Sequence, residues 1–356
     1  MRPESLAFLK RLLDAPGPSA FETAPARLWR AEAETLTPEV GVDVSGNSWA
    51  KLRGSGAHRL LLAGHMDEIG IMVSHVDEEG YLSFEPIGGW DSQVFVGQRV
   101  VLLTAGGNVP GVIGKKAIHL MEKDDREKVS KIEDLWIDIG AASRSEAFAR
   151  VRIGDPGVLA STVLEFPNGR IVSRSLDNRI GSFVVLEALR LLREEGGAAA
   201  GVTAVATTRE EIASGGGGAR PLAVQLDPTV AIVVDVTHAT DYPGIDKRRH
   251  GEYRLGGGPV LSRGSSVNDR VFALLAETAD AEAIPYSIEA ASRDTHTDAE
   301  WFFNAARGIA TALVSVPTRY MHSPNEMVAL EDLERTARLL AAFARRLDDA
   351  RDFVPR

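Results

Sequence analysis

Side chains that bind metal ions or transfer protons recur in this sequence at one kind of position, beside an apolar run. Five separate segments supply them, with the residues His65, Asp67, Asp177, Glu210, Glu211, Asp235 and His322. In an α/β sheet, ligands bind beyond the carboxyl ends of the strands, so residues at these positions are candidates for one common site. Taken alone, each has an ordinary explanation, such as a helix N-cap for Asp177 or a loop residue for His322. Chance is a much weaker explanation for all five placements together.

The pair His65 and Asp67 is more specific than the single residues. Residues two apart on an extended segment point in the same direction. Asp67 can therefore accept a hydrogen bond from one imidazole nitrogen while the other nitrogen of His65 faces a metal ion. Glu210 and Glu211 are adjacent, so their side chains diverge on an extended segment and need not share one task.

Two histidines and three carboxylates are too many ligands for one tetrahedral catalytic ion with an open position. They suit two ions about 3.5–4 Å apart that share a bridging carboxylate. Such a pair of ions lowers the pKa of a shared water, and a nearby unligated carboxylate can take the proton of that water. The sequence contains no cysteine, so the ligands are nitrogen and oxygen atoms. We expect two divalent ions; zinc, cobalt and manganese all suit these ligands, and ligand softness alone does not rank them.

The elements that must carry these residues alternate between two types from about residue 165 onward. Apolar runs predict strands, and apolar positions at helical spacing predict helices. The strands are expected at 59–64, 202–208, 229–236, 285–290 and 309–316, and the helices at 5–13, 22–35, 179–194, 267–281, 298–306 and from 330. This alternation predicts an α/β fold with a mostly parallel sheet between helices.

Residues 71–164 have a different pattern, with alternating and β-branched segments and little helix. We interpret them as a small β-rich domain. It is inserted into a discontinuous α/β domain made of residues 1–70 and 165–356.

Composition narrows the class of protein. The 356 residues are 44% hydrophobic and 25% charged, which is ordinary for a globular chain. A formal net charge of −10 argues against a nucleic-acid partner, because phosphate binding needs clustered lysine and arginine. The N-terminal segment has charges among its apolar residues, unlike a signal peptide, and no apolar stretch approaches the roughly 18 residues of a membrane span. We therefore expect a cytoplasmic location and no membrane partner.

Other features of the sequence are weaker signals of function. The GGGG at 215–218 lacks the spacing of a phosphate-binding loop, which favours a flexible or close-approach turn. There is no GxSxG nucleophile motif. His296 and Asp298 are interpreted as the start of a helix, with a role in substrate positioning as the second interpretation.

Several motifs together resemble the M42 family of metallo-aminopeptidases. They are AGHMDEIG (63–70), SLDNRIG (175–181), the Glu pair after an apolar run, DVTHATDYPG (235–244) and VPTRYMHSPNEMV (316–328), and GVIGKKAIHLM (111–121) is similar as well. Their order and spacing cover nearly the whole chain. The resemblance implies a zinc-exopeptidase-like fold whose inserted small β-barrel or PDZ-like domain is used for dimerisation. It also implies a homo-oligomer built from dimers, up to a dodecamer in many relatives.

The resemblance also implies a role for each candidate residue. His65 and Asp235 correspond to ligands of one ion, Glu211 and His322 to ligands of the other, and Asp177 to the bridge. Glu210 corresponds to the general base, and Asp67 to the group that orients His65. The chain departs from the family after the Glu pair, where it has IASGGGGAR (212–220) in place of a GLRGA-type sequence, and at Arg209, where Gln is frequent. These departures leave the metal ligands intact and leave the substrate preference open.

The leading hypothesis is a dinuclear metal-dependent aminopeptidase that removes N-terminal residues from short peptides, with Glu210 activating a metal-bridging water. One alternative is an amidohydrolase or deacylase of a small N-acylated metabolite on the same two-metal site. A glycoside hydrolase is less favoured, because adjacent carboxylates seldom point into one cleft. A non-catalytic metal-binding scaffold is the remaining alternative.

Overall fold

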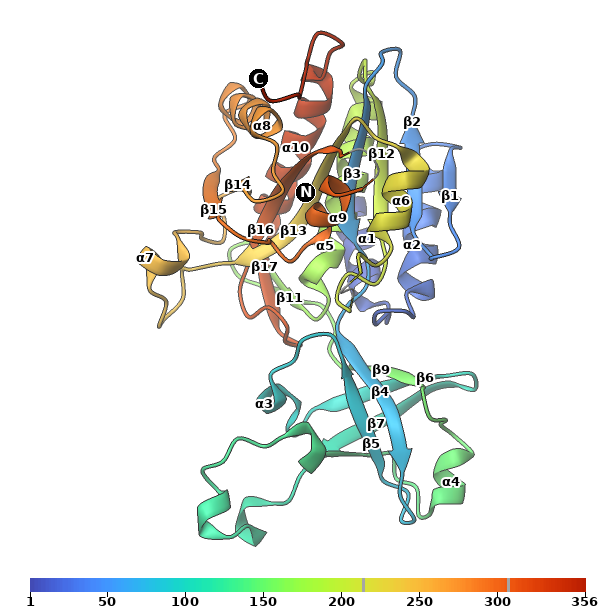
Figure 1. Cartoon of the computed structure of the whole chain (residues 1–356). Coiled ribbons are helices and arrows are strands. Elements are labelled where there is room, and N and C mark those ends of the chain that lie inside the picture. Colours follow the sequence, from blue (N-terminus) through green and yellow to red (C-terminus); the bar gives the residue numbers. More distant parts are fainter. Residues whose placement is uncertain (213–214, 306–307) are drawn as a thin grey trace.

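Four of the five expected strands form the centre of one large sheet, and the fifth, expected at 285–290, lies at its edge. The computed structural model describes residues 1–212, 215–305 and 308–356. It consists of a larger α/β unit and a smaller β unit, which are the upper and lower parts of Figure 1. Both ends of the chain lie in the larger unit.

The large sheet has eight strands among the described residues. Their spatial order is β1 (Val40–Val42), β2 (Ser48–Leu52), β12 (Gly201–Thr207), β3 (Arg59–His65), β13 (Val230–His238), β16 (Ala310–Thr318), β14 (Val260–Gly264) and β15 (Ser287–Ala291). The four central strands β12, β3, β13 and β16 run parallel, as do β14 and β15, whereas the other three pairings are antiparallel. The sheet is therefore mixed, with a parallel centre that holds the ends of the site-bearing strands together.

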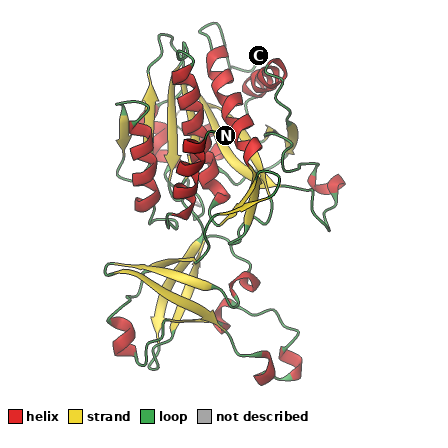
Figure 2. Ribbon diagram, turned by 180° about the vertical axis from the view of Figure 1, so that it is seen from behind, coloured by secondary structure: helices red, strands yellow, loops and turns green. Residues whose placement is uncertain are grey.

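Helices cover both faces of this sheet (Figures 1 and 2). They are α1 (Pro3–Asp14), α2 (Thr23–Glu34), α5 (Leu176–Glu194), α6 (Ala219–Leu226), α8 (Asp269–Ala281), α9 (Asp298–Phe303) and α10 (Leu330–Arg346). The central helix α5 packs against β3, β12 and β13 and against α10. Buried aliphatic and aromatic side chains of these layers form one continuous core, in which Trp29 and Phe183 are almost fully buried. Because burial of apolar area drives folding, this core fixes the sheet and α5 relative to each other.

The smaller unit is a closed barrel of antiparallel strands. In order around the barrel they are β4 (Gly70–Val76), β5 (Leu82–Ile87), β8 (Trp136–Asp138), β7 (Gly107–Gly114), β6 (Arg99–Thr104) and β9 (Pro156–Leu159). Alternate residues such as Leu82 and Phe84 face a separate apolar core. The barrel connections carry short helices, namely α3 (Ser92–Phe95), α4 (Arg144–Phe148) and the 3-10 helices Ile118–Leu120, Lys123–Asp125 and Ile132–Asp134.

A small antiparallel sheet joins two distant parts of the larger unit. It contains β10 (Leu164–Phe166), β11 (Arg170–Ser173) and β17 (Glu326–Ala329), in that order. Since β11 precedes α5 and β17 follows β16, this sheet brings the start of α5 beside the loop after β16. A further short helix, α7 (Lys247–His250), stands out from the side of the unit in Figure 1.

The expected fold class is confirmed, and several elements differ in detail. The helix expected at 298–306 ends at Phe303, and residues 306 and 307 lie outside the described residues. The short strands β14 and β17 were not anticipated, because their four or five residues show no clear apolar period. Among the described residues, no helix is both long enough and apolar enough to cross a membrane.

Candidate metal centre

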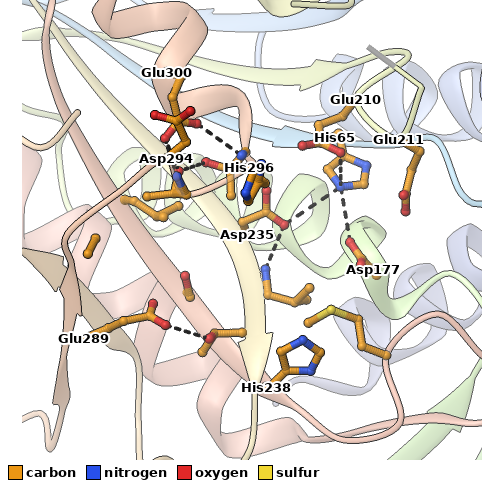
Figure 3. A pocket seen from close by; sticks show the side chains of 18 of the residues that line it. His65, Asp177, Glu210, Glu211, Asp235, His238, Glu289, Asp294, His296 and Glu300 are labelled. Carbon is orange, nitrogen blue, oxygen red and sulfur yellow. Dashed lines mark hydrogen bonds and ion pairs between the residues drawn. The ribbon is translucent and has the colours of Figure 1, made fainter. Parts of the chain in front are cut away.

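The structure brings all seven candidate residues to one edge of the large sheet. His65 ends β3, Asp235 lies near the end of β13, and Asp67 follows β3 by two residues. Glu210 and Glu211 lie in the loop after β12. Asp177 lies in the first turn of α5, and His322 lies in the loop between β16 and β17. Figure 3 shows the labelled members of this group turned toward one another.

One cluster of possible metal ligands consists of His65, Asp177 and Asp235, all of them buried. The Nε2 atom of His65 lies 3.2 Å from Oδ1 of Asp177 and 3.8 Å from Oδ1 of Asp235 (Figure 3). One ligand atom of each residue lies within 4.8 Å of the others. Three such atoms can bind one ion and leave a position open.

A second cluster consists of Asp177, Glu211 and His322. The Nε2 atom of His322 lies 3.4 Å from Oδ2 of Asp177 and 3.3 Å from Oε2 of Glu211. Asp177 belongs to both clusters and turns one carboxylate oxygen toward each histidine. This is the arrangement that a carboxylate needs to bridge two ions.

Glu210 lies beside the first cluster without belonging to either one. Its Oε2 atom is 3.7 Å from Nε2 of His65. Burial raises the pKa of Glu210 well above its usual value, although the nearby His65 opposes this effect. A buried carboxylate with a raised pKa is suited to accept and return a proton at neutral pH.

Asp67 supports both sides of the first cluster. Its Oδ1 atom lies 3.3 Å from Nδ1 of His65. The same carboxylate accepts hydrogen bonds from the backbone amides of Glu210 at 3.2 Å and Glu211 at 3.1 Å, and from the hydroxyl of Ser19. Asp67 therefore fixes the ring of His65. It also fixes the backbone of the Glu pair, which the sequence did not indicate.

A buried arginine holds the turn that follows His65. Arg179, on α5, is fully buried and donates from Nε to the carbonyl of Met66 at 3.0 Å. Its Nη2 atom donates to Glu68 at 2.8 Å, and Glu68 also accepts from the amide of Gly17 at 3.0 Å. Arg174 forms a second ion pair with Glu68. These bonds tie the turn to the helix that carries Asp177.

The donor set fits divalent cations. Burial raises the pKa of Glu211 to about 7 and that of Asp235 well above its usual value, with the charge of Asp177 adding to both shifts. Burial alone would lower the pKa of His322, but its bonds to Asp177 and Glu211 raise it to about 11. Among the described residues, the Oε1 atom of Glu211 is buried and has no hydrogen-bond partner. Cations would relieve both the carboxylate repulsion and this unsatisfied oxygen.

A cavity of about 1160 Å³ opens beside the two clusters. Its wall includes Glu289, Asp294 and Glu300, together with Arg293. Glu289 lies on the edge strand β15 and accepts hydrogen bonds from Thr237 and Ser262, each at 3.2 Å. The cavity lies beyond the carboxyl ends of the parallel strands, where ligands of α/β sheets bind.

The residues with weaker sequence signals are Asp298, His296 and Arg209. Asp298 starts α9 and accepts a hydrogen bond from the hydroxyl of Thr207 at 2.6 Å. Burial raises the pKa of Asp298 to about 6. His296 lines the cavity. The side chain of Arg209 donates to the carbonyl of Ser45, in a neighbouring loop, at 2.9 Å.

The glycine-rich segment after the Glu pair is only partly described. Ala213 and Ser214, within the departure IASGGGGAR, lie outside the described residues. A Cβ atom at Gly218 would lie 2.0 Å from Oδ1 of Asn47, and one at Gly217 would lie 2.6 Å from the carbonyl oxygen of Arg209. These two glycines therefore allow a close approach of the backbone, as expected for a turn of this kind.

Glu326 is the main site residue that the sequence did not indicate. It is 2% exposed and accepts hydrogen bonds from the backbone amides of Asp177 at 3.0 Å and His322 at 2.9 Å. Burial and the charge of Asp177 raise the pKa of Glu326 well above its usual value. A glutamate four residues after a histidine gives no signal of this role, because most glutamates lie on the surface.

Comparison with known proteins agrees with this geometry. The profile of the M42 glutamyl aminopeptidase family matches residues 46–339. The lysyl aminopeptidase of Pyrococcus furiosus is 34% identical over 351 residues, which are 98% of each chain.

Two solved structures are similar over almost the whole chain. The TET aminopeptidase of a marine sediment Thaumarchaeota archaeon is 36% identical, with a TM-score of 0.92 and coverage of 97% of both chains. The TET1 peptidase of Pyrococcus horikoshii, which can assemble into a tetrahedron or a large octahedral shell, is 31% identical, with a TM-score of 0.85 and coverage of 96% of this chain and 100% of that one. The chain therefore belongs to the M42 family of aminopeptidases and is a metal-dependent peptidase.

Proposed function

We propose that this peptidase binds two divalent ions and removes the N-terminal residue of short peptides. The observation that carries the proposal is the position of Asp177, whose two carboxylate oxygens face two separate clusters. His65 and Asp235 complete the site of one ion, and Glu211 and His322 complete the other. Zinc is the preferred ion for these nitrogen and oxygen ligands, with cobalt or manganese as alternatives.

Bound ions of this kind lower the pKa of a water and polarise a carbonyl group. Glu210 lines the cavity with its Oε2 atom 3.7 Å from Nε2 of His65, and it belongs to neither ligand set. We assign it the role of general base, which takes a proton from the attacking water and returns it to the leaving amine. Asp67 contacts both His65 and the backbone amide of Glu210, and so holds the two residues in place for this transfer.

The cavity beside the clusters accepts the first residue of the peptide. Among the described residues of its wall, the acidic side chains Glu289, Asp294 and Glu300 outnumber the single arginine, Arg293. We propose that this excess of negative charge favours a basic N-terminal residue, and that Glu289 contributes through its anchored carboxylate. The name of the lysyl aminopeptidase of Pyrococcus furiosus is in line with such a preference.

A panel of aminoacyl substrates tests this preference. The wild-type chain should have a higher kcat/KM for lysyl and arginyl substrates than for leucyl or glutamyl substrates. Glu289→Gln should reduce this advantage by about 10-fold, which corresponds to a loss of roughly 1.4 kcal/mol of differential binding. An unchanged ratio in Glu289→Gln would remove the role of that residue, whereas a preference for glutamyl substrates would contradict the proposed substrate class.

The alternative activity uses the same two ions on a different amide. The IASGGGGAR departure motivates an amidohydrolase or deacylase that acts on a small N-acylated metabolite. Adding N-acyl amino acids to the aminoacyl panel separates the two activities, since an aminopeptidase needs a free α-amino group. Metal analysis of the purified chain, run on the same preparation, gives the number of ions.

The two remaining alternatives are tested by metal removal. Glu211 lies in a cluster of possible metal ligands beside His322, and a metal ligand is not available as one of the two free carboxylates of a glycoside hydrolase. A chelator should abolish hydrolysis, and added zinc, cobalt or manganese should restore it. Activity that survives chelation would favour the glycosidase, and absence of any hydrolysis by the metal-loaded chain would favour the scaffold.

We also propose that residues 71–164 form the dimerisation domain of a homo-oligomer built from dimers, up to a dodecamer. Large apolar side chains are exposed on this part of the chain, among them Val112, Ile118, Leu120 and Val129. Exposed apolar groups of this kind often mark contacts between subunits. A cytoplasmic location stays a prediction.

A further inference from the structure

Besides Glu210, two buried carboxylates, Asp67 and Glu326, stand beside the metal centre without belonging to either cluster of ligands. Asp67 holds the first cluster through the imidazole of His65 and the amides of Glu210 and Glu211. Glu326 stands on the other side and has no role in the chemistry proposed above. Its contacts repeat the pattern of Asp67, because it too accepts bonds from the backbone of residues in the site.

Both hydrogen bonds of Glu326 go to residues of the second cluster. Its Oε2 atom accepts from the amide of Asp177 at 3.0 Å, and its Oε1 atom accepts from the amide of His322 at 2.9 Å. Each oxygen thus holds one ligand. The two ligands are 145 positions apart in the sequence, as residues 177 and 322, so a single side chain links two distant segments of the chain.

The position of Glu326 is itself fixed by pairing of strands. Glu326 is the first residue of β17, and its partner on β11 is Ser173, which lies four residues before Asp177. The side chain is 2% exposed, so it has little freedom to move. The small sheet therefore supplies a rigid base from which the carboxylate reaches both ligands.

Near each of the two hydrogen bonds of Glu326, the backbone includes a residue in an unfavourable conformation. His322 has φ of 58° and Tyr320 has φ of 60°, in the left-handed region that residues other than glycine seldom adopt. Ser175, just before α5, has φ of 63° and gives α5 no side-chain cap. Such conformations persist only where surrounding contacts impose them, and the two bonds of Glu326 are such contacts.

We propose that Glu326 is a positioning residue for the second ion. Its carboxylate holds Asp177 and His322 in place, as Asp67 holds the first cluster. This inference rests on the proposed two-metal function. In either protonation state the carboxyl group offers two oxygens as acceptors, whereas the amide of glutamine offers only one. Loss of a residue that orients metal ligands typically costs 10–100-fold in metal affinity.

The test is a zinc titration of the chelator-treated full chain by calorimetry, for the wild type, Glu326→Gln and Asn325→Ala. Asn325 is exposed and adjacent in sequence, so its variant is a matched control. Wild type and Asn325→Ala should bind two ions per chain with the same affinities. Glu326→Gln should keep one affinity within about 3-fold and lose about 10–100-fold in the other.

Thermal unfolding of the metal-free proteins separates positioning from a merely structural role. We expect the metal-free Glu326→Gln chain to unfold within a few degrees of the wild type, while its stabilisation by added zinc is smaller. Peptide hydrolysis at limiting zinc should fall and then recover in excess zinc. If Glu326→Gln does not fold, Glu326→Asp carries the same test, because its shorter side chain cannot reach both amides.

Two unchanged affinities in a folded Glu326 variant would overturn the inference. A loss of metal-free stability that accounts for the weaker zinc binding, with no recovery in excess zinc, would overturn it as well. If the wild type itself bound one ion or none, the two-metal function would fail instead.

Discussion

The protonation of the metal ligands should be visible in the pH dependence of metal uptake. In the metal-free site the pKa of Glu211 is raised to about 7, chiefly by burial, and that of His322 to about 11, through its bonds to Asp177 and Glu211. A divalent ion must displace these protons, since metal ligands bind in their deprotonated form. Lower pH therefore favours the proton, and higher pH favours the metal.

We accordingly expect the apparent affinity for zinc to rise from pH 6 to pH 8, by up to about 10-fold for each proton displaced per pH unit. Calorimetry in buffers of different ionisation enthalpy measures the number of protons released. His322→Ala should release fewer protons than the wild type at pH 7. An affinity that is flat over this range would contradict the assigned protonation of the second cluster.

Part of the site could be predicted from residue types, and part could not. His65, Asp177 and Asp235 stand beside apolar runs, and that placement is readable because strand ends define the binding edge of a parallel sheet. Glu326 and Glu68 gave no such signal. Their roles depend on contacts with residues about 150 and 110 positions away in the sequence, and no local pattern encodes such a contact.

Among the elements, α5 carries both a candidate metal ligand and a buried arginine that supports the site. It carries Asp177 in its first turn and the buried Arg179 two residues later. Arg179 binds Glu68 and the carbonyl of Met66, so it fixes the turn after β3 against the helix. Removing one partner of a buried ion pair leaves the other charge uncompensated.

Arg179→Met should therefore lower the free energy of unfolding by about 3–5 kcal/mol, because Glu68 loses one of its buried guanidinium partners. Chemical denaturation followed by circular dichroism measures this loss. Arg248→Met is the matched control, since Arg248 is 94% exposed and its ion pair is at the surface. It should change stability by less than about 0.5 kcal/mol. Equal stabilities of the two variants would show that the buried pair does not support the fold.

The large sheet was more predictable than the elements around it. The strands β3, β12, β13 and β16 are buried on both faces and appear in the sequence as continuous apolar runs. The short strands β14 and β17 depend on long-range pairing instead. Their own residues mix glycine, serine, arginine and glutamate with apolar side chains, which no single period describes.

The whole molecule has two units with separate cores, joined where β3 leads into β4 and where β9 leads into β10 (Figure 1). The metal centre lies in the larger unit, whereas large apolar side chains are exposed on the smaller unit, such as Ile118 at 55% and Leu120 at 70%. Covering this surface by a second copy of the chain would remove it from water. Because the two regions are separate, we expect that substitutions on the smaller unit can change subunit assembly without altering the metal ligands.

Light scattering after size exclusion should give a mass that is a multiple of 38.3 kDa. The double variant Ile118→Glu and Leu120→Glu should lower this mass, because charge in an apolar contact is costly to bury. Val44→Glu is the control, since Val44 is fully exposed on the larger unit. A wild-type mass of 38.3 kDa, or a double variant that assembles like the wild type, would contradict the proposed surface.

In the proposed mechanism, two ions and one unligated carboxylate carry out peptide hydrolysis beside the cavity. Metal analysis and aminoacyl-substrate turnover, measured together on the wild type and Glu210→Gln, test it most directly. We expect two ions per chain in both proteins, and a fall in kcat of about 10²–10⁴-fold in Glu210→Gln, the range typical of a lost general base. A Glu210→Gln chain that kept both ions and normal turnover, or a fully active wild type with a single ion, would contradict the account.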